Sequence, residues 1–158
     1  MRIVAFSDTH KHTEHCVRLL ENMQGNIDAV LHAGDVAEDI DFLTKRFPDI
    51  KIYGVRGNND MFKTTPLPAK LVLEFDGIKL LLTHGHSYNV KYTYEDIADT
   101  AMECGAKIAV FGHTHQSCDR TENGIRLINP GSSTGVWPTY AVIEIEDGKF
   151  NTDIISLR

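Results

Sequence analysis

Short apolar segments that stop abruptly at polar, glycine-marked turns recur along this chain, and they restrict the folds open to it. The clearest example is the strand pattern of residues 50–55, which runs into Gly54-Val55-Arg56-Gly57-Asn58-Asn59-Asp60. Strand ends of this kind are where α/β proteins place ligands and chemistry. Taken alone, the stretch also fits a tight loop in which Asn and Asp favour a turn.

The first 60 residues alternate strand patterns with helix patterns. Apolar strands are expected at 2–7, 28–32 and 50–55, and the apolar spacing of helices is found at 13–23 and 38–47. Gly25-Asn26 and Pro48 end the two helices. Because strand–helix–strand units cross over in one sense, the three strands are expected to be parallel.

After residue 60 the chain becomes richer in β structure. Loops are expected at 61–70, 86–93 and 116–123, and a helix at 94–103. Further strands are expected at 71–75, 78–83, 107–111, 125–128, 140–145 and 150–156. We therefore predict an α/β fold in one domain, residues 1–158, with two mixed β-sheets packed together and helices on their outer faces.

Composition narrows the classes of function. The net charge of −6 disfavours a broad contact with long nucleic acid or with an anionic membrane. The three cysteines, Cys16, Cys104 and Cys118, form no C-x-x-C pair, which is typical of reduced thiols. No run approaches 18 apolar residues, and the N-terminal apolar run is too short for a signal peptide. These features predict a soluble, cytoplasmic protein without a membrane partner.

Candidate metal ligands gather at the ends of the predicted strands. They are Asp8, His10, Asp35, Asn58, His84, His113 and His115. In an extended segment residues i and i+2 point to the same side, so Asp8 with His10 could bind one ion. Imidazole with carboxylate suits divalent transition metals, and seven donors are about right for two ions. Each residue taken singly could equally be a helix cap, a turn former or a solvent-facing side chain.

Five short motifs occur in the order Asp8-x-His10, Gly34-Asp35, Gly57-Asn58-x-Asp60, His84 and Gly112-His113-x-His115. Together they resemble the signature blocks of the calcineurin-like metallophosphoesterases. The short length and the segment Asn129-Pro130-Gly131-Ser132 are most similar to its small YfcE-like bacterial and archaeal phosphodiesterase branch. The resemblance implies a four-layer αββα sandwich with a dinuclear metal centre.

The resemblance also implies how the ligands divide between two divalent ions. One ion would be held by Asp8, His10, Asp35 and His115. The other would be held by Asp35, Asn58, His84 and His113. Manganese is the expected metal, and nickel, cobalt, iron and zinc also suit these ligands.

The function that follows is a metal-dependent phosphodiesterase acting on a small phosphoester. Two cations about 3.5–4 Å apart lower the pKa of a bridging water, and the resulting hydroxide attacks phosphorus in line with the leaving oxygen. Asp35 and Asn58 would hold the ions, and the guanidinium of Arg56 could bind a phosphate oxygen. Asp60 is expected to orient an imidazole ligand. His86 and Ser132 are weaker candidates for substrate contact.

Asn59 departs from the wider family, most members of which carry at this position a histidine thought to protonate the leaving group. A carboxamide cannot act as a general acid near neutral pH. The expected substrates are therefore diesters with good leaving groups.

Two alternatives come from the same resemblance. One is a protein-binding scaffold like the retromer subunit of this fold, and the other is a phosphomonoesterase or nucleotidase. Retention of all seven candidate ligands argues against the scaffold. Edge strands near the C-terminus suggest a homodimer or a higher homo-oligomer.

Overall fold

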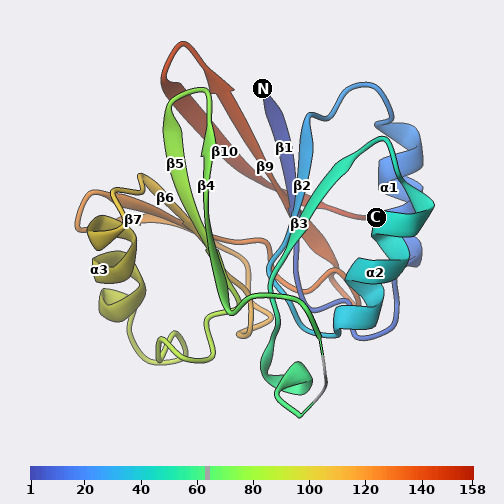
Figure 1. The fold of residues 1–158 in the computed structure, drawn as a ribbon, viewed down its shortest axis with the longest axis horizontal. Coiled ribbons are helices and arrows are strands. Elements are labelled where there is room, and N and C mark those ends of the chain that lie inside the picture. The colour runs from blue at the N-terminus through green and yellow to red at the C-terminus, as the bar shows by residue number, and fades with distance from the viewer. Residues whose placement is uncertain (63–64) are drawn as a thin grey trace.

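Two five-stranded β-sheets pack against each other in the computed structural model, which describes residues 1–62 and 65–158 (Figure 1). The first sheet has the strand order β10-β9-β1-β2-β3, and the second has the order β4-β5-β6-β8-β7. The elements in chain order are β1 (Arg2–Phe6), α1 (Glu14–Asn22), β2 (Ala29–His32), α2 (Ala37–Arg46), β3 (Lys51–Gly54), the 3₁₀ helix η1 (Asn58–Asp60), β4 (Lys70–Phe75), β5 (Ile78–Thr83), α3 (Glu95–Glu103), β6 (Ile108–Val110), β7 (Cys118–Glu122), β8 (Ile125–Asn129), β9 (Thr139–Glu146) and β10 (Lys149–Ser156).

Both sheets are mixed, as the sequence predicts. In the first sheet β1, β2 and β3 are parallel, whereas β9 and β10 are antiparallel to their neighbours. In the second sheet β5, β6 and β8 are parallel, and β4 and β7 form antiparallel edges. The parallel strands are short and mostly apolar because both of their faces are covered.

Alternate residues of the central strands face different apolar layers. In β1, Ile3 packs between the two sheets, while Val4 packs in the layer that holds Leu20 of α1 and Leu43 of α2. On the opposite side, α3 packs on the second sheet through Ile97 and its neighbours. Figure 1 shows α1 and α2 on one outer face and α3 on the other. The predicted four-layer αββα sandwich is therefore confirmed.

The loops that follow the parallel strands are joined to one another across the two sheets. The backbone N–H of Ser133, after β8, donates to the carbonyl of Ser7, after β1, at 3.0 Å. The N–H of Gly112, after β6, donates to the carbonyl of His84, after β5, also at 3.0 Å. The carboxyl ends of both sheets thus form one polar edge of the sandwich.

The sequence prediction was wrong at one strand. Residues 116–123, interpreted as a loop, contain β7, which pairs antiparallel with β8 across Asn123-Gly124. The strand has the sequence CDRTE and lies at the edge of the sheet, so it lacks the apolar alternation of a half-buried strand. The loop predicted at 61–70 includes residues 63 and 64, which lie outside the described residues.

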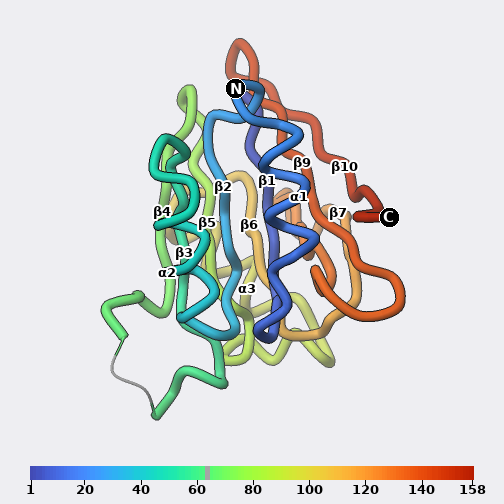
Figure 2. The backbone as a smooth tube through the Cα atoms, turned by 90° about the vertical axis from the view of Figure 1, so that its right-hand side faces the viewer, coloured from blue at the N-terminus to red at the C-terminus, as the bar shows by residue number. Residues whose placement is uncertain are grey.

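Two further observations bear on partners. None of the helices in the described part of the chain has the length and apolar character needed to cross a bilayer. Figure 2 shows β10 along one edge of the first sheet, near the C-terminus. Pairing of this edge with a second copy remains a prediction.

Candidate metal centre

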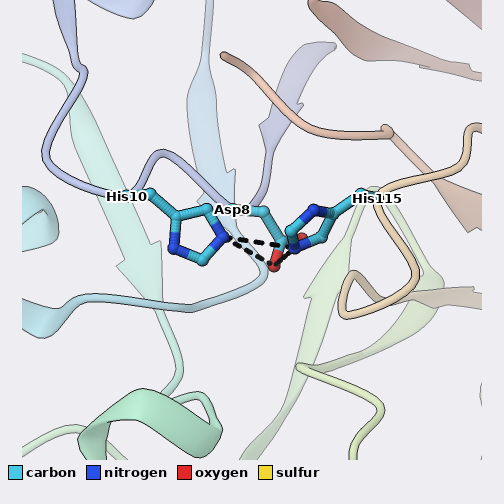
Figure 3. Close-up of side chains that lie close together, drawn as sticks. All are labelled: Asp8, His10 and His115. Atoms are coloured by element: carbon cyan, nitrogen blue, oxygen red, sulfur yellow. Dashed lines mark hydrogen bonds and ion pairs between the residues drawn. The ribbon is translucent and has the colours of Figure 1, made fainter. Parts of the chain in front are cut away.

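One group of candidate ligands surrounds a carboxylate oxygen of Asp8 (Figure 3). His115 Nε2 lies 3.2 Å from Asp8 Oδ1, and His10 Nε2 lies 3.9 Å from the same atom. The two imidazole nitrogens are 3.2 Å apart. Loops after β1 and β6, which belong to different sheets, therefore bring three donors to one point.

A second group gathers around the carboxamide of Asn58. Its Oδ1 lies 3.0 Å from His84 Nε2 and 2.9 Å from His113 Nδ1. Asp8, Asp35 and His84 offer ligand atoms that all lie within 4.8 Å of one another, so this group adjoins the first. The structure thus brings together all seven candidate ligands that the sequence indicates.

The partners of these groups show that a cation fits the site. Asp8 is fully buried, and its Oδ2 accepts hydrogen bonds from Ser7 Oγ at 2.6 Å and from the His113 N–H at 3.1 Å. Among the described residues, no hydrogen bond reaches its other oxygen, Oδ1. An unpaired buried carboxylate oxygen costs free energy unless a positive charge compensates it.

His84 supports the same conclusion. Its Nδ1 lies 2.8 Å from the carbonyl of Ala33, which can only accept a hydrogen bond. Nδ1 therefore carries the proton, and Nε2 presents a lone pair toward the oxygen of Asn58. Two facing acceptors repel each other, and a cation held by both atoms would relieve that repulsion. A backbone carbonyl that fixes the tautomer of a ligand is common at metal sites.

The backbone around the ligands differs from the extended geometry that the sequence suggests. Asp8, His10, His113 and His115 all have positive φ angles, between 46° and 68°. Non-glycine residues rarely adopt this left-handed conformation, and such strain gathers at functional sites. Asp8 and His10 do reach a common site, but through a tight turn rather than through strand alternation.

Two glycines allow the ligand loops to approach each other. A Cβ atom on Gly57 would overlap Asp35 Oδ1, and a Cβ on Gly112 would lie 2.7 Å from Asp8 Oδ2. Larger side chains at either position would push a carboxylate out of place.

Asn59 contacts Asp35 rather than open space. Its backbone N–H donates to Asp35 Oδ1 at 2.8 Å, and its Nδ2 donates to Asp35 Oδ2 at 2.5 Å. Asp35 is the residue expected to bridge the two ions. Asn59 therefore orients a candidate ligand, a role that the sequence prediction did not include.

Asp60 and Arg56 complete the 54–60 segment. The carboxylate of Asp60 is buried and accepts hydrogen bonds from the backbone N–H of Gly57 and of Ala37, each at 2.9 Å. The structure thus gives Asp60 backbone partners in two segments, and the orientation of an imidazole ligand by Asp60 stays a prediction. Arg56 is exposed, and its backbone N–H donates to Pro68.

Burial and neighbouring charges lower the pKa of two imidazoles that lie beside His84, those of His113 and His86. Burial, followed by the neighbouring His84 and by Lys91, lowers the pKa of His113 to about 4. Burial and His84 also lower the pKa of His86, and the charge of Arg56 adds to this shift. Neutral imidazoles offer lone pairs, which is the state that a metal ligand needs.

A buried polar network under the site was not predicted from the sequence. Thr9 Oγ1 donates to Asp39 Oδ2 at 2.7 Å and lies 3.2 Å from His32 Nε2, and the N–H of Gly34 donates to His32 Nδ1 at 3.2 Å. The network joins the loop of Asp8 to the loop of Asp35. Burial lowers the pKa of His32 to about 3, so this imidazole is also neutral. The sequence feature that could have identified His32 is its position as the last residue of a buried strand.

Asn129 is a second residue whose role was missed. It ends β8, and its Nδ2 donates to the carbonyl of Gly112 at 2.8 Å and to Thr114 Oγ1 at 3.0 Å. It therefore holds the loop that carries His113 and His115. Ser132, three residues later, donates from Oγ to the carbonyl of Asp8 at 3.0 Å.

The fold and the site together define a class of protein. An αββα sandwich with histidine, carboxylate and carboxamide donors at the carboxyl ends of both sheets is the arrangement that the sequence motifs imply for a metallophosphoesterase. The family described as the calcineurin-like phosphoesterase superfamily domain matches residues 1–148. The chain belongs to this superfamily.

Two curated relatives cover nearly the whole chain. A protein of Bacillus subtilis named probable metallophosphoesterase YsnB is 31% identical over 93% of this chain and 86% of its own length. A protein of Methanocaldococcus jannaschii named phosphodiesterase MJ0936 is 24% identical over 98% of this chain and 99% of its own.

Solved structures agree in fold. A protein of Streptococcus pneumoniae described as a predicted phosphoesterase is 29% identical, with a TM-score of 0.81 over 99% of this chain and 89% of that one. Vps29 of Entamoeba histolytica, solved with zinc, is 24% identical, with a TM-score of 0.77 over the full length of both chains. The second likeness establishes the fold alone.

Proposed function

We propose that this metallophosphoesterase is a phosphodiesterase with a dinuclear metal centre that cleaves small phosphodiesters. The observation that carries the proposal is the buried Asp8 Oδ1, which has no hydrogen-bond partner among the described residues and faces His10 and His115. A buried carboxylate oxygen without a partner costs free energy, and a bound cation would remove that cost. The relative named as a phosphodiesterase adds support for the diester.

The residues would divide between two ions as the family motifs imply. Asp8, His10 and His115 would hold one ion, Asn58, His84 and His113 would hold the other, and Asp35 would contact both. We propose manganese, although the donor set also suits nickel, cobalt, iron and zinc. Bound ions would supply hydroxide near neutral pH and would neutralise charge on the phosphate.

The chain's own side chains would orient the candidate ligands and bind the substrate. Ser7 and the His113 N–H hold one oxygen of Asp8, so that its other oxygen points into the site. Asn59 holds both oxygens of Asp35 in a fixed orientation. Arg56, exposed beside Asn58, would bind a non-bridging phosphate oxygen.

A cytoplasmic location is part of the proposal. Cys16, Cys104 and Cys118 are all free thiols, which suits a reducing compartment.

The test uses two chromogenic esters, bis-(p-nitrophenyl) phosphate as the diester and p-nitrophenyl phosphate as the monoester. We expect nitrophenol release from the diester with added Mn²⁺, a lower kcat/KM for the monoester, and loss of turnover with a chelator. Preference for the monoester would instead support a phosphomonoesterase.

Two exposed histidines provide a matched pair of variants. His115→Gln should remove the turnover because the side chain lies 3.2 Å from Asp8 Oδ1. His12→Gln, at an exposed position outside the site, should retain it. The alternative of a protein-binding scaffold would be favoured if no divalent metal gave turnover with either ester.

A further inference from the structure

The geometry points to a second anion-binding subsite beside the metal centre, in a cavity lined by Val90, Lys91, Tyr94, Thr114 and Gln116. We propose that it binds a phosphate group carried by one arm of the diester. The substrate would then be a phosphodiester with a further phosphate about one sugar away from the scissile bond. This inference deepens the proposed function and rests on it.

The cavity shares a wall with the candidate metal centre. Thr114 lies between His113 and His115 in the chain, so the loop that carries two candidate ligands also lines the cavity. Its Oγ1 accepts hydrogen bonds from Asn129 Nδ2 at 3.0 Å and from the Gln116 N–H at 3.2 Å. These bonds fix the wall, so a group bound in the cavity has a fixed position relative to the ions.

The opposite wall is apolar and firmly packed. Val90 is buried, and the Tyr94 ring packs against Phe111 with 5.6 Å between ring centroids. The cavity volume is about 300 Å³, at the lower end of the range for small-molecule sites. That volume suits a sugar with one phosphate, and it is too small for several nucleotides of a polymer.

The charge of the lining selects for an anion. The lining residues include one cation, Lys91, and no carboxylate. No carboxylate of the described residues lies within ion-pair distance of the Lys91 ammonium group. The Arg120 guanidinium lies 5.5 Å from the centre of the Tyr94 ring but is paired with Glu122 at 2.8 Å, so Lys91 supplies the positive charge of the lining. In a chain of net charge −6, such a cationic cavity is a local exception.

A doubly anchored substrate would place one phosphate at the candidate metal centre and the other against Lys91, on either side of the loop that carries Thr114. Gln116, which is exposed, offers amide donors to the same group.

The test compares two esters that differ only in the second phosphate. They are the p-nitrophenyl ester of thymidine 5′-phosphate and the same ester with an added 3′-phosphate. We expect wild-type kcat/KM to favour the 3′-phosphorylated ester about tenfold, which corresponds to about 1.4 kcal/mol. Lys91→Gln should bring the ratio of the two kcat/KM values close to one, and Lys91→Arg should keep most of it.

Lys149→Gln is the matched control, because this lysine is exposed in the β9–β10 hairpin. It should leave the ratio as in the wild type. A wild-type ratio near one, or a Lys91→Gln ratio equal to that of the wild type, would overturn the proposal.

A binding measurement separates this inference from the proposed function. Calorimetry on the Mn²⁺-loaded protein would compare thymidine 3′,5′-bisphosphate with thymidine 5′-monophosphate. We expect tighter binding of the bisphosphate by about tenfold, and equal binding of both by Lys91→Gln. If the protein turned over no ester but kept this difference, the phosphodiesterase proposal would fail while the subsite stood. Equal affinities in an active wild type would remove the subsite alone.

Discussion

Gly57→Ala should damage the metal centre by a purely steric route. The φ and ψ angles of Gly57 are −103° and −172°, which alanine adopts without strain. The added Cβ would overlap Asp35 Oδ1 and would lie 2.8 Å from Asp35 Cα. Because one of these contacts is to a backbone atom, the loop of Asp35 must move by several tenths of an ångström.

The expected size of the effect follows from the contacts. Overpacking a tight position costs about 1–3 kcal/mol of unfolding free energy. Loss of the support that orients a ligand lowers metal affinity about 10–100-fold. Gly57→Ala should show both effects, because the displaced group is the carboxylate that Asn59 holds in place.

Gly54→Ala is the matched control. Its Cβ would lie 2.7 Å from Ile40 Cγ2, so it is also overpacked, but against a core side chain of α2 rather than against a candidate ligand. We expect a similar loss of stability with Mn²⁺ affinity close to that of the wild type.

Calorimetric titration with Mn²⁺ and urea unfolding of the metal-free proteins measure the two effects separately. The reasoning would be refuted if Gly57→Ala bound Mn²⁺ as tightly as the wild type, or if Gly54→Ala lost as much affinity as Gly57→Ala.

Three further predictions follow from the same contacts. Burial lowers the pKa of His32 from its usual 6.5 to about 3, so as pH falls the unfolded chain takes up a proton before the folded chain does. The contribution of this group to the free energy of unfolding is therefore complete above about pH 6.5 and is lost as pH falls toward 3. In urea unfolding of the metal-free protein, this group should lower the free energy of unfolding by about 2 kcal/mol between pH 6.5 and 5. An equally steep loss of unfolding free energy in His32→Gln would contradict the assignment of the effect to His32. Asn59→His should raise the turnover of alkyl esters relative to aryl esters, and should lower Mn²⁺ affinity because the bond from Asn59 Nδ2 to Asp35 is lost; an unchanged alkyl-to-aryl ratio would exclude the missing acid as the limit on substrates. Mn²⁺ at a hundred times its dissociation constant should raise the melting temperature by about 5–10 °C, since binding adds about 2.7 kcal/mol. A melting temperature that chelator leaves unchanged would show that the ions do not bind the folded state preferentially.

The fold could be predicted largely from apolar patterning. In β5 (Ile78–Thr83), the three consecutive leucines Leu80–Leu82 are apolar because both faces of the strand are buried there, and the Asp76-Gly77 turn marks its hairpin with β4. β7 (Cys118–Glu122) could not be found in this way, because an exposed edge strand needs no apolar face. Its only signal is the Asn123-Gly124 turn that follows it.

The site could be predicted in residue type but not in geometry. Polar residues at strand ends identified the candidate ligands, since the carboxyl ends of parallel strands converge. The positive φ angles of Asp8 and His113 and the orientation of Asp35 by Asn59 depend on contacts between loops distant in sequence. Such contacts leave no local pattern. The network around His32 could not be predicted for the same reason, because its partners Thr9 and Gly34 lie on two separate loops.

The most direct test of the dinuclear centre is the number of manganese ions bound per chain. Calorimetric titration of the metal-free protein, checked by elemental analysis after gel filtration, gives this number without reference to any substrate. Wild-type protein should bind two ions per chain, and His113→Ala, which removes a donor from the Asn58 group alone, should keep one. A wild-type protein that binds one ion or none would contradict the account.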